Sequence, residues 1–313
     1  MAVQSQIPDR RSAIRAGAGW RRRLRSGLTH LVLAAGAALV AFPFFWMVMT
    51  ALKGDAEARG FPRLTVFPTR WMWGNFAEAW RLAPFLECFR NTFIVASVVA
   101  LGVVVTSLLA GYAFARIRFA GKRVLFVVFL ATMMVPFEVV LVPNFMTVTW
   151  MKKAFASTMV ALLGDGVQPA SATVAGFAAL IVPWCANVFS IFLVTQFFRQ
   201  LPEDYYDAAR LDGCGHWQFL WRIGAPMVAP ALLTAGLFSF LWSWNALLWP
   251  LVVNDPNEVP VVQKALAQLV TAEQEGFNLL MAASAFSIVP IIALYVVAQR
   301  WFIEGVTGTG LKG

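Results

Sequence analysis

Few side chains in this sequence are of the types that perform metal or nucleophilic chemistry. The cysteines are scattered and the histidines stand far apart, at Cys88, Cys185, Cys214, His30 and His216. Their spacing matches no zinc site, no CxxC motif and no local cysteine–histidine pair. We therefore expect no metal centre and no thiol-based active site.

The sequence also lacks a loop that would cradle nucleotide phosphates. The segment AGKR at 120–123 comes nearest to the pattern GxxxxGK[ST], but Arg116 stands where the first glycine is required. HExxH, GxSxG and a close pair of buried carboxylates are missing as well. We expect a non-catalytic chain that holds no cofactor, so that any ATP and magnesium are bound by a separate subunit.

One carboxylate falls inside a long apolar run. Glu138 lies in MMVPFEVVLVPNF, between Pro136 and Pro143. An ionisable group at membrane depth is costly and is commonly functional. The alternative is a structural carboxylate near the outer interface, beside a helix that proline breaks. The sequence leaves both interpretations open.

Other residues in the apolar runs are candidates to line a path for a solute. Asn187 interrupts one run, where it could instead be a helix–helix hydrogen-bonding group, and Trp242 and Trp249 flank another candidate cluster. Indoles at these positions could stack on a sugar or form an aromatic belt at the membrane surface. The candidate path comprises Glu138, Asn187, Trp244 and Asn245.

The elements that carry these residues are long and apolar. The chain is 59% hydrophobic and 13% charged, whereas a soluble domain has about 25% charged residues. Lipid admits only helices or closed barrels, and the alternation of barrel strands is missing. We predict an all-α, polytopic membrane helix bundle with about six transmembrane helices, at 28–52, 91–115, 124–149, 172–197, 228–253 and 278–302.

The positive charges predict the orientation of this bundle. Most of the 25 lysines and arginines fall in an N-terminal arm (1–27), in the loop after the second run, in the segment 198–227 and in a tail (303–313). Cytoplasmic loops carry this excess, so both termini are expected in the cytoplasm and residues 28–302 in the membrane. The net charge of +9 flanks apolar segments and forms no single patch, which argues against nucleic acid as a partner. The first run reads as a retained span and not as a cleaved signal peptide.

The polar segment EDYYDAARLDGCGHWQFLWRIGAP has the signals of two short helices joined by an elbow. Pro202 suits a first turn, and the glycines at 213 and 215 should end the first helix. A second helix, HWQFLWRI, is expected to place Trp217, Leu220 and Trp221 on one face and to end at Gly224. A connector resting on lipid headgroups is the alternative, but its carboxylates would be repelled by an anionic membrane surface. A protein partner is favoured.

This segment resembles the EAA loop of ABC-importer permeases, whose pattern is EAAxxxG, nine residues, then IxLP. Asp207-Ala208-Ala209 is followed at the same spacings by Gly213 and by Ile223-Gly224-Ala225-Pro226. Aspartate replaces the glutamate and alanine the leucine. ARIRFAGKR, LVTQFFRQLPED, WSWNALLWPLVV and the tail AQRWFIEGVTGTGLKG extend the resemblance to carbohydrate-uptake permeases, similar to the second permease subunit of the maltose transporter.

The resemblance implies a subunit of the cell inner membrane that forms a heterodimer with a second permease. Two ATP-binding cassette subunits and an extracytoplasmic substrate-binding protein complete the complex, and segment 254–277 is expected to reach toward the binding protein. It further implies a cargo of sugar or oligosaccharide, or alternatively glycerol-3-phosphate. Its contacts with the ATPase are implied at Asp207, Ala208, Ala209, Gly213, Ile223 and Pro226, with the tail adding Gly308, Lys312 and Gly313.

An ion-coupled secondary carrier that uses Glu138 is the competing class of protein. It predicts transport without ATP and gives no reason for the elbow or the tail.

Overall fold

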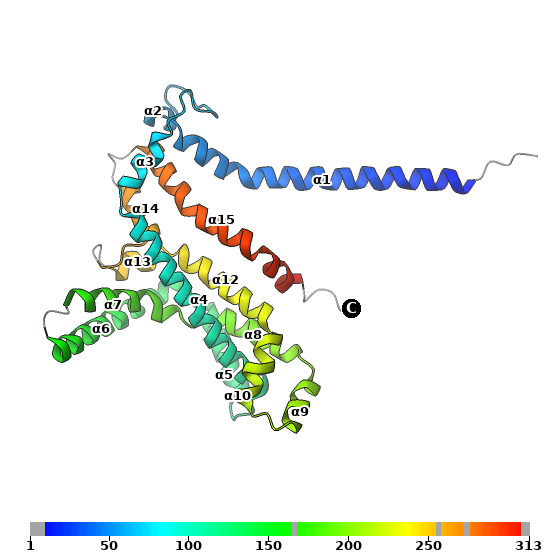
Figure 1. Cartoon of the computed structure of the whole chain (residues 1–313), viewed down its shortest axis with the longest axis vertical. Helices are drawn as coiled ribbons and strands as arrows, with labels where there is room; N and C mark the ends of the chain where they lie inside the picture. The colour runs from blue at the N-terminus through cyan, green and yellow to red at the C-terminus, as the bar shows by residue number, and fades with distance from the viewer. Residues whose placement is uncertain (1–9, 165–167, 255–257, 272–275, 308–313) are drawn as a thin grey trace, which may run out of the picture. The chain divides into compact units, whose positions relative to one another are not determined.

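The computed structural model describes residues 10–164, 168–254, 258–271 and 276–307 (Figure 1). Every regular element in these ranges is helical, as predicted. The chain divides into two units, one of Met1–Phe76 with Phe277–Ala285 and one of Ala77–Gly276 with Phe286–Gly313. The elements are α1 (Arg10–Ala51), α2 (Asp55–Ala58), α3 (Gly74–Arg81), α4 (Phe85–Arg116), α5 (Lys122–Ala131), η1 (Thr132–Met134), α6 (Phe137–Leu163), α7 (Gln168–Ile181), η3 (Val182–Trp184), α8 (Val188–Gln200), α9 (Glu203–Leu211), α10 (His216–Phe219), η4 (Leu220–Gly224), α11 (Ala225–Met227), α12 (Ala229–Trp244), α13 (Leu248–Val253), α14 (Val262–Thr271) and α15 (Phe277–Thr307).

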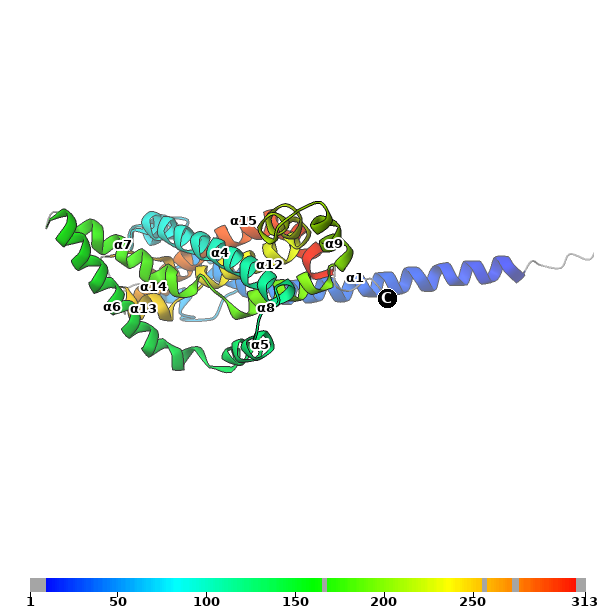
Figure 2. The same cartoon turned by 90° about the horizontal axis from the view of Figure 1, so that it is seen from below.

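Three of the described helices are long and apolar enough to cross a membrane unbroken, within α1, α4 and α15. The other three candidate spans are bent pairs of helices, and two of them differ from the predicted bounds: the first extends to Leu162, beyond 149, and the third runs from His216 in the polar segment to Trp244, whereas 228–253 was predicted. The angles are 102° between Lys122–Met134 and Phe137–Leu162, 48° between Ser171–Trp184 and Val188–Gln200, and 76° between His216–Met227 and Ala229–Trp244. Six spans are therefore recovered when each bent pair counts as one. Figure 2 shows the bend that separates α5 from α6.

Prolines lie at two of the three breaks. Pro136 precedes α6, and Pro183 lies in η3, where a residue without an amide hydrogen cannot continue the helical ladder. The residue before Pro136 is also pushed toward extended backbone, since Val135 has φ −78° and ψ 117°. The hydrophobic pattern of the sequence alone indicates an uninterrupted apolar run at these positions.

Helix α4 is the central element of the larger unit and packs along both α8 and α12 (Figure 1). Close approach of α4 to α8 and to the segment just before it depends on two glycines. A Cβ at Gly102 would lie 2.6 Å from Cys185 Sγ, and one at Gly111 would lie 2.8 Å from Val194 Cγ1 and 3.2 Å from the Thr195 amide nitrogen. At both positions the two segments are so close that a residue larger than glycine does not fit without a shift of its neighbours.

Gly111→Ala is expected to destabilise the protein. Overpacking costs about 1–3 kcal/mol, which exceeds the gain of up to about 1 kcal/mol from better helix propensity. Gly36→Ala in α1 is the matched control, because no atom lies within 4 Å of its Cβ and only the propensity gain applies. Thermal unfolding in detergent should give a lower midpoint for Gly111→Ala and an unchanged or higher one for Gly36→Ala. Equal midpoints would contradict the packing argument.

In the smaller unit, buried polar side chains hold the end of α1. Asn75 Nδ2 donates to the carbonyl oxygens of Ala51 at 2.7 Å and Lys53 at 2.8 Å, and Asn278 Nδ2 donates to the Lys53 oxygen at 3.1 Å. The side chain of Lys53 is buried, and its Nζ donates to the Thr65 oxygen at 2.5 Å. These bonds satisfy carbonyls that the end of a helix leaves free.

Glu57 organises the loop that follows. Its carboxylate accepts hydrogen bonds from Thr65 Oγ1 at 2.8 Å, from the Thr69 amide at 3.0 Å and from Thr69 Oγ1 at 3.0 Å. Burial raises the pKa of Glu57, but these bonds and the charge of Lys53 outweigh it, so the pKa is lowered overall. The carboxylate therefore stabilises the loop at neutral pH, and this stabilisation is lost as the pH falls through the lowered pKa.

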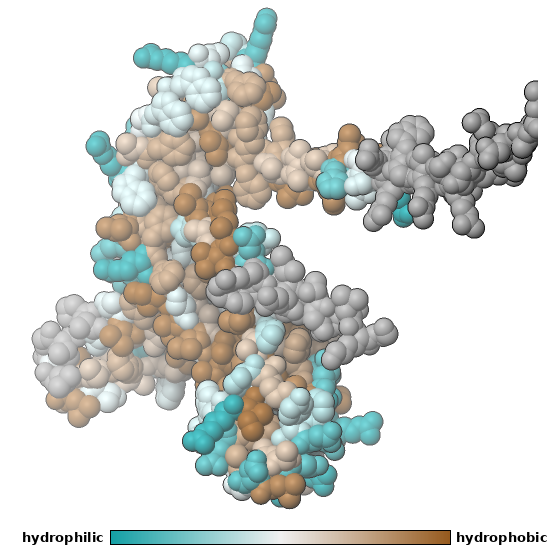
Figure 3. All heavy atoms as spheres, turned by 45° about the vertical axis from the view of Figure 1, so that its right-hand side comes forward, coloured by the Kyte–Doolittle hydropathy of each residue, from teal (hydrophilic) through white to brown (hydrophobic). Residues whose placement is uncertain are grey.

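Much of the helical surface is apolar. Figure 3 shows brown, hydrophobic residues over the helices of the larger unit and hydrophilic residues gathered at the end that carries α9 and α10. Exposed apolar side chains include Leu101, Val124, Val139, Met146 and Val289. Exposure of so much apolar surface to water is unfavourable, so we infer that lipid surrounds these faces.

Candidate functional site

Segment 198–227 folds as two short helices around a glycine elbow. Helix α9 begins after Pro202, which is the N-cap and not the first helical residue, and Glu203 and Asp204 occupy its first turn. Acidic residues in the first turn are stabilised by the positive end of the helix dipole. The helix ends at Leu211, as predicted from the glycines that follow.

The elbow itself is a Schellman motif. The Cys214 amide donates to the Ala209 oxygen at 2.9 Å, and the Gly213 amide donates to the Arg210 oxygen at 3.0 Å. These bonds require a left-handed residue after the C-cap, and Gly213 has φ +81°. Gly215 has φ −75° and ψ 168°, an ordinary extended conformation, so only the first of the two glycines is required for the turn.

The second helix differs from the prediction. Leu220 is buried, while Trp217 and Trp221 are exposed with their rings 5.7 Å apart, so the three do not share a face. Residues Leu220–Gly224 form a wider π-helical turn, which changes the spacing of side chains around the axis. Gly224 does not end the helix, because the chain stays helical through Met227 and bends at Val228.

Both short helices are anchored to the ends of α4 and α8. Tyr112 Oη of α4 lies 2.8 Å from His216 Nδ1 of α10, and Tyr206 Oη of α9 lies 3.2 Å from the same nitrogen. One imidazole thus connects three helices. Phe198 of α8 packs against the ring of Tyr112 at 5.6 Å. Helices α9 and α10 are therefore in contact with both long helices.

Arg116 at the end of α4 adds a polar connection. Its Nη2 donates to the carbonyl oxygens of Phe198 at 3.1 Å and Leu201 at 2.5 Å, which are otherwise free at the end of α8. Its Nη1 lies 3.9 Å from Glu203 Oε1 at the start of α9. The guanidinium side chain is 10% exposed, so it is held mainly inside the protein.

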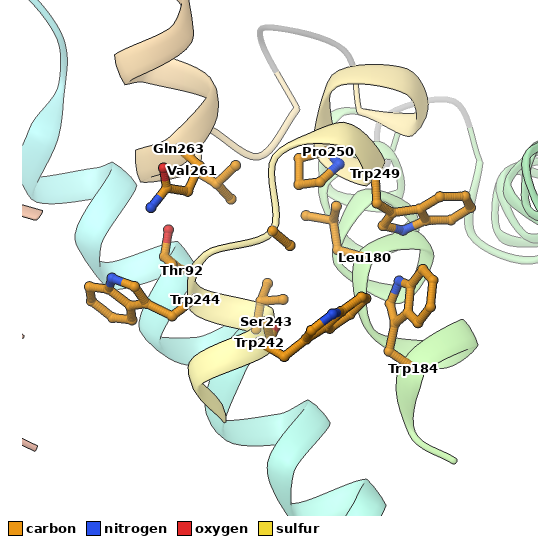
Figure 4. Close-up of a pocket in the computed structure, with 12 residues that line it drawn as sticks. Thr92, Leu180, Trp184, Trp242, Ser243, Trp244, Trp249, Pro250, Val261 and Gln263 are labelled. Atoms are coloured by element: carbon orange, nitrogen blue, oxygen red, sulfur yellow. The ribbon is translucent and has the colours of Figure 1, made fainter. Parts of the chain in front are cut away.

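A second group of residues lies in the larger unit where helices are interrupted. Trp184 of η3 is 4.6 Å from Trp242 of α12 and 5.6 Å from Trp249 of α13, measured between ring centroids. These indoles form one wall of a cavity of about 20 Å³, and Thr92 and Gln263 lie on its other side (Figure 4). The mixture of indoles and a few polar groups is typical of small-molecule sites.

The comparison with known families decides what the elbow and the helix bundle belong to. Residues 102–308 match the family described as binding-protein-dependent transport system inner membrane component. The chain belongs to this family. It is a permease, a transport protein of the membrane, as the EAA-like spacing indicated.

The chain matches curated permeases along nearly their whole length. The permease is 28% identical to the arabinooligosaccharides transport system permease protein AraQ of Halalkalibacterium halodurans, covering 93% of this chain and 100% of the relative. It is 28% identical to the diacetylchitobiose uptake system permease protein NgcG of Streptomyces coelicolor, covering 91% and 88%. It is 26% identical to the sn-glycerol-3-phosphate transport system permease protein UgpE of Yersinia enterocolitica, covering 88% and 94%.

A solved structure shows the same fold. One chain of a bacterial ABC transporter involved in the import of the acidic polysaccharide alginate superposes with a TM-score of 0.69 at 19% identity, covering 96% of this permease and 100% of that chain. The fold of an ABC-importer permease is thereby confirmed.

The predicted coupling residues of the permease differ in accessibility. Asp207 and Ala208 are exposed on α9, whereas Ala209 is buried in the cluster formed with α4 and α8. Ile223 is half-buried in η4, and Pro226 is exposed in α11. The predicted tail contacts Gly308, Lys312 and Gly313 lie outside the described residues, as do 255–257 and 272–275 of the segment expected to reach a binding protein.

The predicted path residues do not form one cluster of exposed groups. Glu138 is exposed in the first turn of α6. Asn187 is the N-cap of α8, where its Oδ1 accepts from the Ser190 amide at 3.0 Å, so it caps its own helix. Trp244 is 1% exposed, and its Nε1 donates to the Ser287 oxygen at 3.3 Å. Asn245 is exposed at the end of α12.

Sequence reasoning missed three positions that the fold makes central, Trp184, Arg116 and His216. The proline in IVPWCAN signalled a helix break beside Trp184. For His216 and Arg116 no local signal existed, because Tyr112 lies 104 positions from His216 and Phe198 lies 82 positions from Arg116, so these pairs are recognisable only in the folded chain.

Proposed function

We propose that this permease is the second transmembrane subunit of an ATP-driven importer of carbohydrates. It forms a heterodimer with another permease in the cell inner membrane, with both termini in the cytoplasm. Two ATP-binding cassette subunits bind ATP and magnesium, and an extracytoplasmic binding protein delivers the solute. The family match carries this proposal, and two of the three curated relatives named above are permeases for saccharides.

The elbow segment is proposed to be the ATPase docking site. Asp207 and Ala208 are exposed on α9, and the helix is tied through His216 and Arg116 to α4 and α8. Docking of α9 into an ATPase would therefore move the helix bundle as the ATPase opens and closes. Glu138, exposed in the first turn of α6, keeps both of its alternatives, a place beside the translocation path or a structural role near the outer interface.

The transported solute can be tested with three probes taken from the relatives. Arabinotriose, diacetylchitobiose and sn-glycerol-3-phosphate are offered to proteoliposomes that contain the permease, its partner permease, the ATPase and the binding protein. We expect uptake of a saccharide that requires ATP and stops when the ATPase is omitted. Uptake of sn-glycerol-3-phosphate alone would favour the alternative cargo. Uptake driven by an ion gradient without the ATPase would overturn the proposal in favour of a secondary carrier.

A further inference from the structure

The two short helices of the elbow differ in charge. Helix α9 and its C-cap carry four carboxylates, all of them exposed, at Glu203, Asp204, Asp207 and Asp212. The segment that follows, 214–227, contains no carboxylate, and its single arginine, Arg222, is exposed. One helix of the elbow is therefore acidic and the other has a positive formal charge, so the two are suited to different surroundings.

The second helix, His216–Met227, has one buried face and one exposed face. Phe219 and Leu220 are each 2% exposed and pack in the cluster that includes residues of α4 and α8. Trp217 is 65% exposed and Trp221 is 44% exposed, with their ring centroids 5.7 Å apart. Arg222, the next residue, is exposed as well. The exposed surface of this helix therefore combines two indoles with a cation.

The bend at Val228 sets the direction of this helix relative to a span. The second helix makes an angle of 76° with Ala229–Trp244, which is α12 (Figure 1). Helix α12 contains no charged residue, so it is the part of the pair that crosses the hydrocarbon. Spans tilt by about 20° on average from the bilayer normal, so a helix that meets a span at 76° runs close to the membrane plane.

We propose that the second helix is an interfacial helix that binds anionic phospholipid, with Trp217 and Trp221 in the headgroup layer and Arg222 on a lipid phosphate. Indoles favour the boundary between hydrocarbon and water, because the ring is apolar while its N–H can still meet a polar partner. A guanidinium forms paired hydrogen bonds with a phosphate. Amphipathic helices that lie on membranes combine these residue types.

A protein partner accounts less well for this helix. If the whole elbow entered the ATPase, one acidic helix and one positively charged helix would have to complement the same surface. An anionic membrane surface repels the carboxylates of α9 but attracts Arg222, so each helix is matched when α9 alone faces the ATPase. Ile223 and Pro226, which the resemblance assigns to the ATPase contact, then belong to the helix on the membrane.

The test uses a fluorescent label on each helix and spin-labelled phospholipid in the bilayer. The sample is the complete transporter in proteoliposomes, with the native cysteines of the permease replaced by alanine. The label is attached at Trp221→Cys or, as the matched control, at Asp207→Cys, which is exposed on α9. Phosphatidylcholine and phosphatidylglycerol with a doxyl group near the headgroup are the quenchers. We expect quenching at Trp221→Cys and little at Asp207→Cys.

Arg222→Gln separates the charge from the apolar contact. An arginine close to an anionic surface corresponds to an about fivefold preference for anionic lipid. Doxyl phosphatidylglycerol should therefore quench the Trp221→Cys label at a lower mole fraction than doxyl phosphatidylcholine does, and Arg222→Gln should abolish this difference. Arg210→Gln is the control, because it removes the same charge from an exposed position on α9 and should leave the difference unchanged.

Several results would overturn the proposal. Protection of the Trp221→Cys label when the ATPase is added to the two permeases would show that the ATPase covers this helix. Equal quenching by the two lipids, or an equal effect of Arg222→Gln and Arg210→Gln, would show that no anionic lipid is bound there. If Trp221→Cys does not assemble, the label is moved to the exposed Gln218, as Gln218→Cys, and the same outcomes decide.

The proposal goes beyond the proposed function and does not depend on the solute. Quenching reports the surroundings of the second helix whether or not a saccharide is transported. Failure to import a saccharide would overturn the proposed cargo alone, and an unquenched Trp221→Cys label in a transporter that imports a saccharide would overturn the lipid contact alone.

Discussion

Gly213→Val is expected to uncouple ATP hydrolysis from uptake while the permease still inserts into the membrane. Residues other than glycine adopt φ +81° at a cost of about 1–2 kcal/mol, and a β-branched side chain is the least suited to it. A permease that is stable by about 5–15 kcal/mol survives this loss. The equilibrium between the native elbow and other conformations, however, shifts about tenfold away from the native elbow for each 1.4 kcal/mol. We therefore expect α9 to leave its docking position.

The effect is expected to arise in the backbone and not from a steric clash. No atom lies within 4 Å of a Cβ built at Gly213 or at Gly215. The two glycines thus offer a matched pair, because they differ in φ and not in the free space around them. Gly213→Ala should impair coupling clearly, and Gly215→Ala, at φ −75°, should impair it little.

The measurements are co-purification of the ATPase and stimulated ATP hydrolysis in proteoliposomes. We expect Gly213→Val to reduce ATPase co-purification or to leave hydrolysis that moves no solute. Normal association and coupling, with only the affinity for the solute altered, would place Gly213 in a substrate site and contradict the role proposed for the elbow.

Much of the fold could be predicted because hydrophobic length is a local property. Each apolar run needs only its own residues to reveal that it can span lipid, and the glycine after α9 needs only local sequence to indicate a helix end. The bends between paired helices were harder to predict. Proline can break or merely kink an apolar helix, and which of the two occurs depends on the packing of neighbours such as α4.

The candidate site could be predicted only where its residues are contiguous. The spacing of Asp207, Gly213 and Pro226 lies within one segment and was readable. The orientation of indoles was not, because adjacent tryptophans in WSWNALLW differ in burial according to what packs beside them. Trp244 turns inward to Ser287, and Trp242 remains half exposed beside Trp184.

Arg116→Met is expected to cause the largest loss of stability among the substitutions considered. It leaves the Phe198 and Leu201 carbonyls at the end of α8 without the guanidinium that now donates to them. Hydrogen bonds from a charged donor are worth about 1.5–3 kcal/mol each, so a total near 3 kcal/mol is expected. The midpoint of thermal unfolding in detergent should fall by about 5–10 °C.

Related substitutions separate the hydrogen bonds of Arg116 from its ion pair. Glu203 is 87% exposed and its carboxylate lies 3.9 Å from the guanidinium, so Glu203→Gln should lower the free energy of unfolding by less than about 1 kcal/mol. Arg116→Lys keeps the charge but loses the fork that reaches both carbonyls, and should fall between the two. Arg118→Met, at an exposed position two residues away, should leave the midpoint unchanged. A loss in Glu203→Gln as large as that in Arg116→Met would show that the ion pair, and not the end of α8, is what Arg116 stabilises.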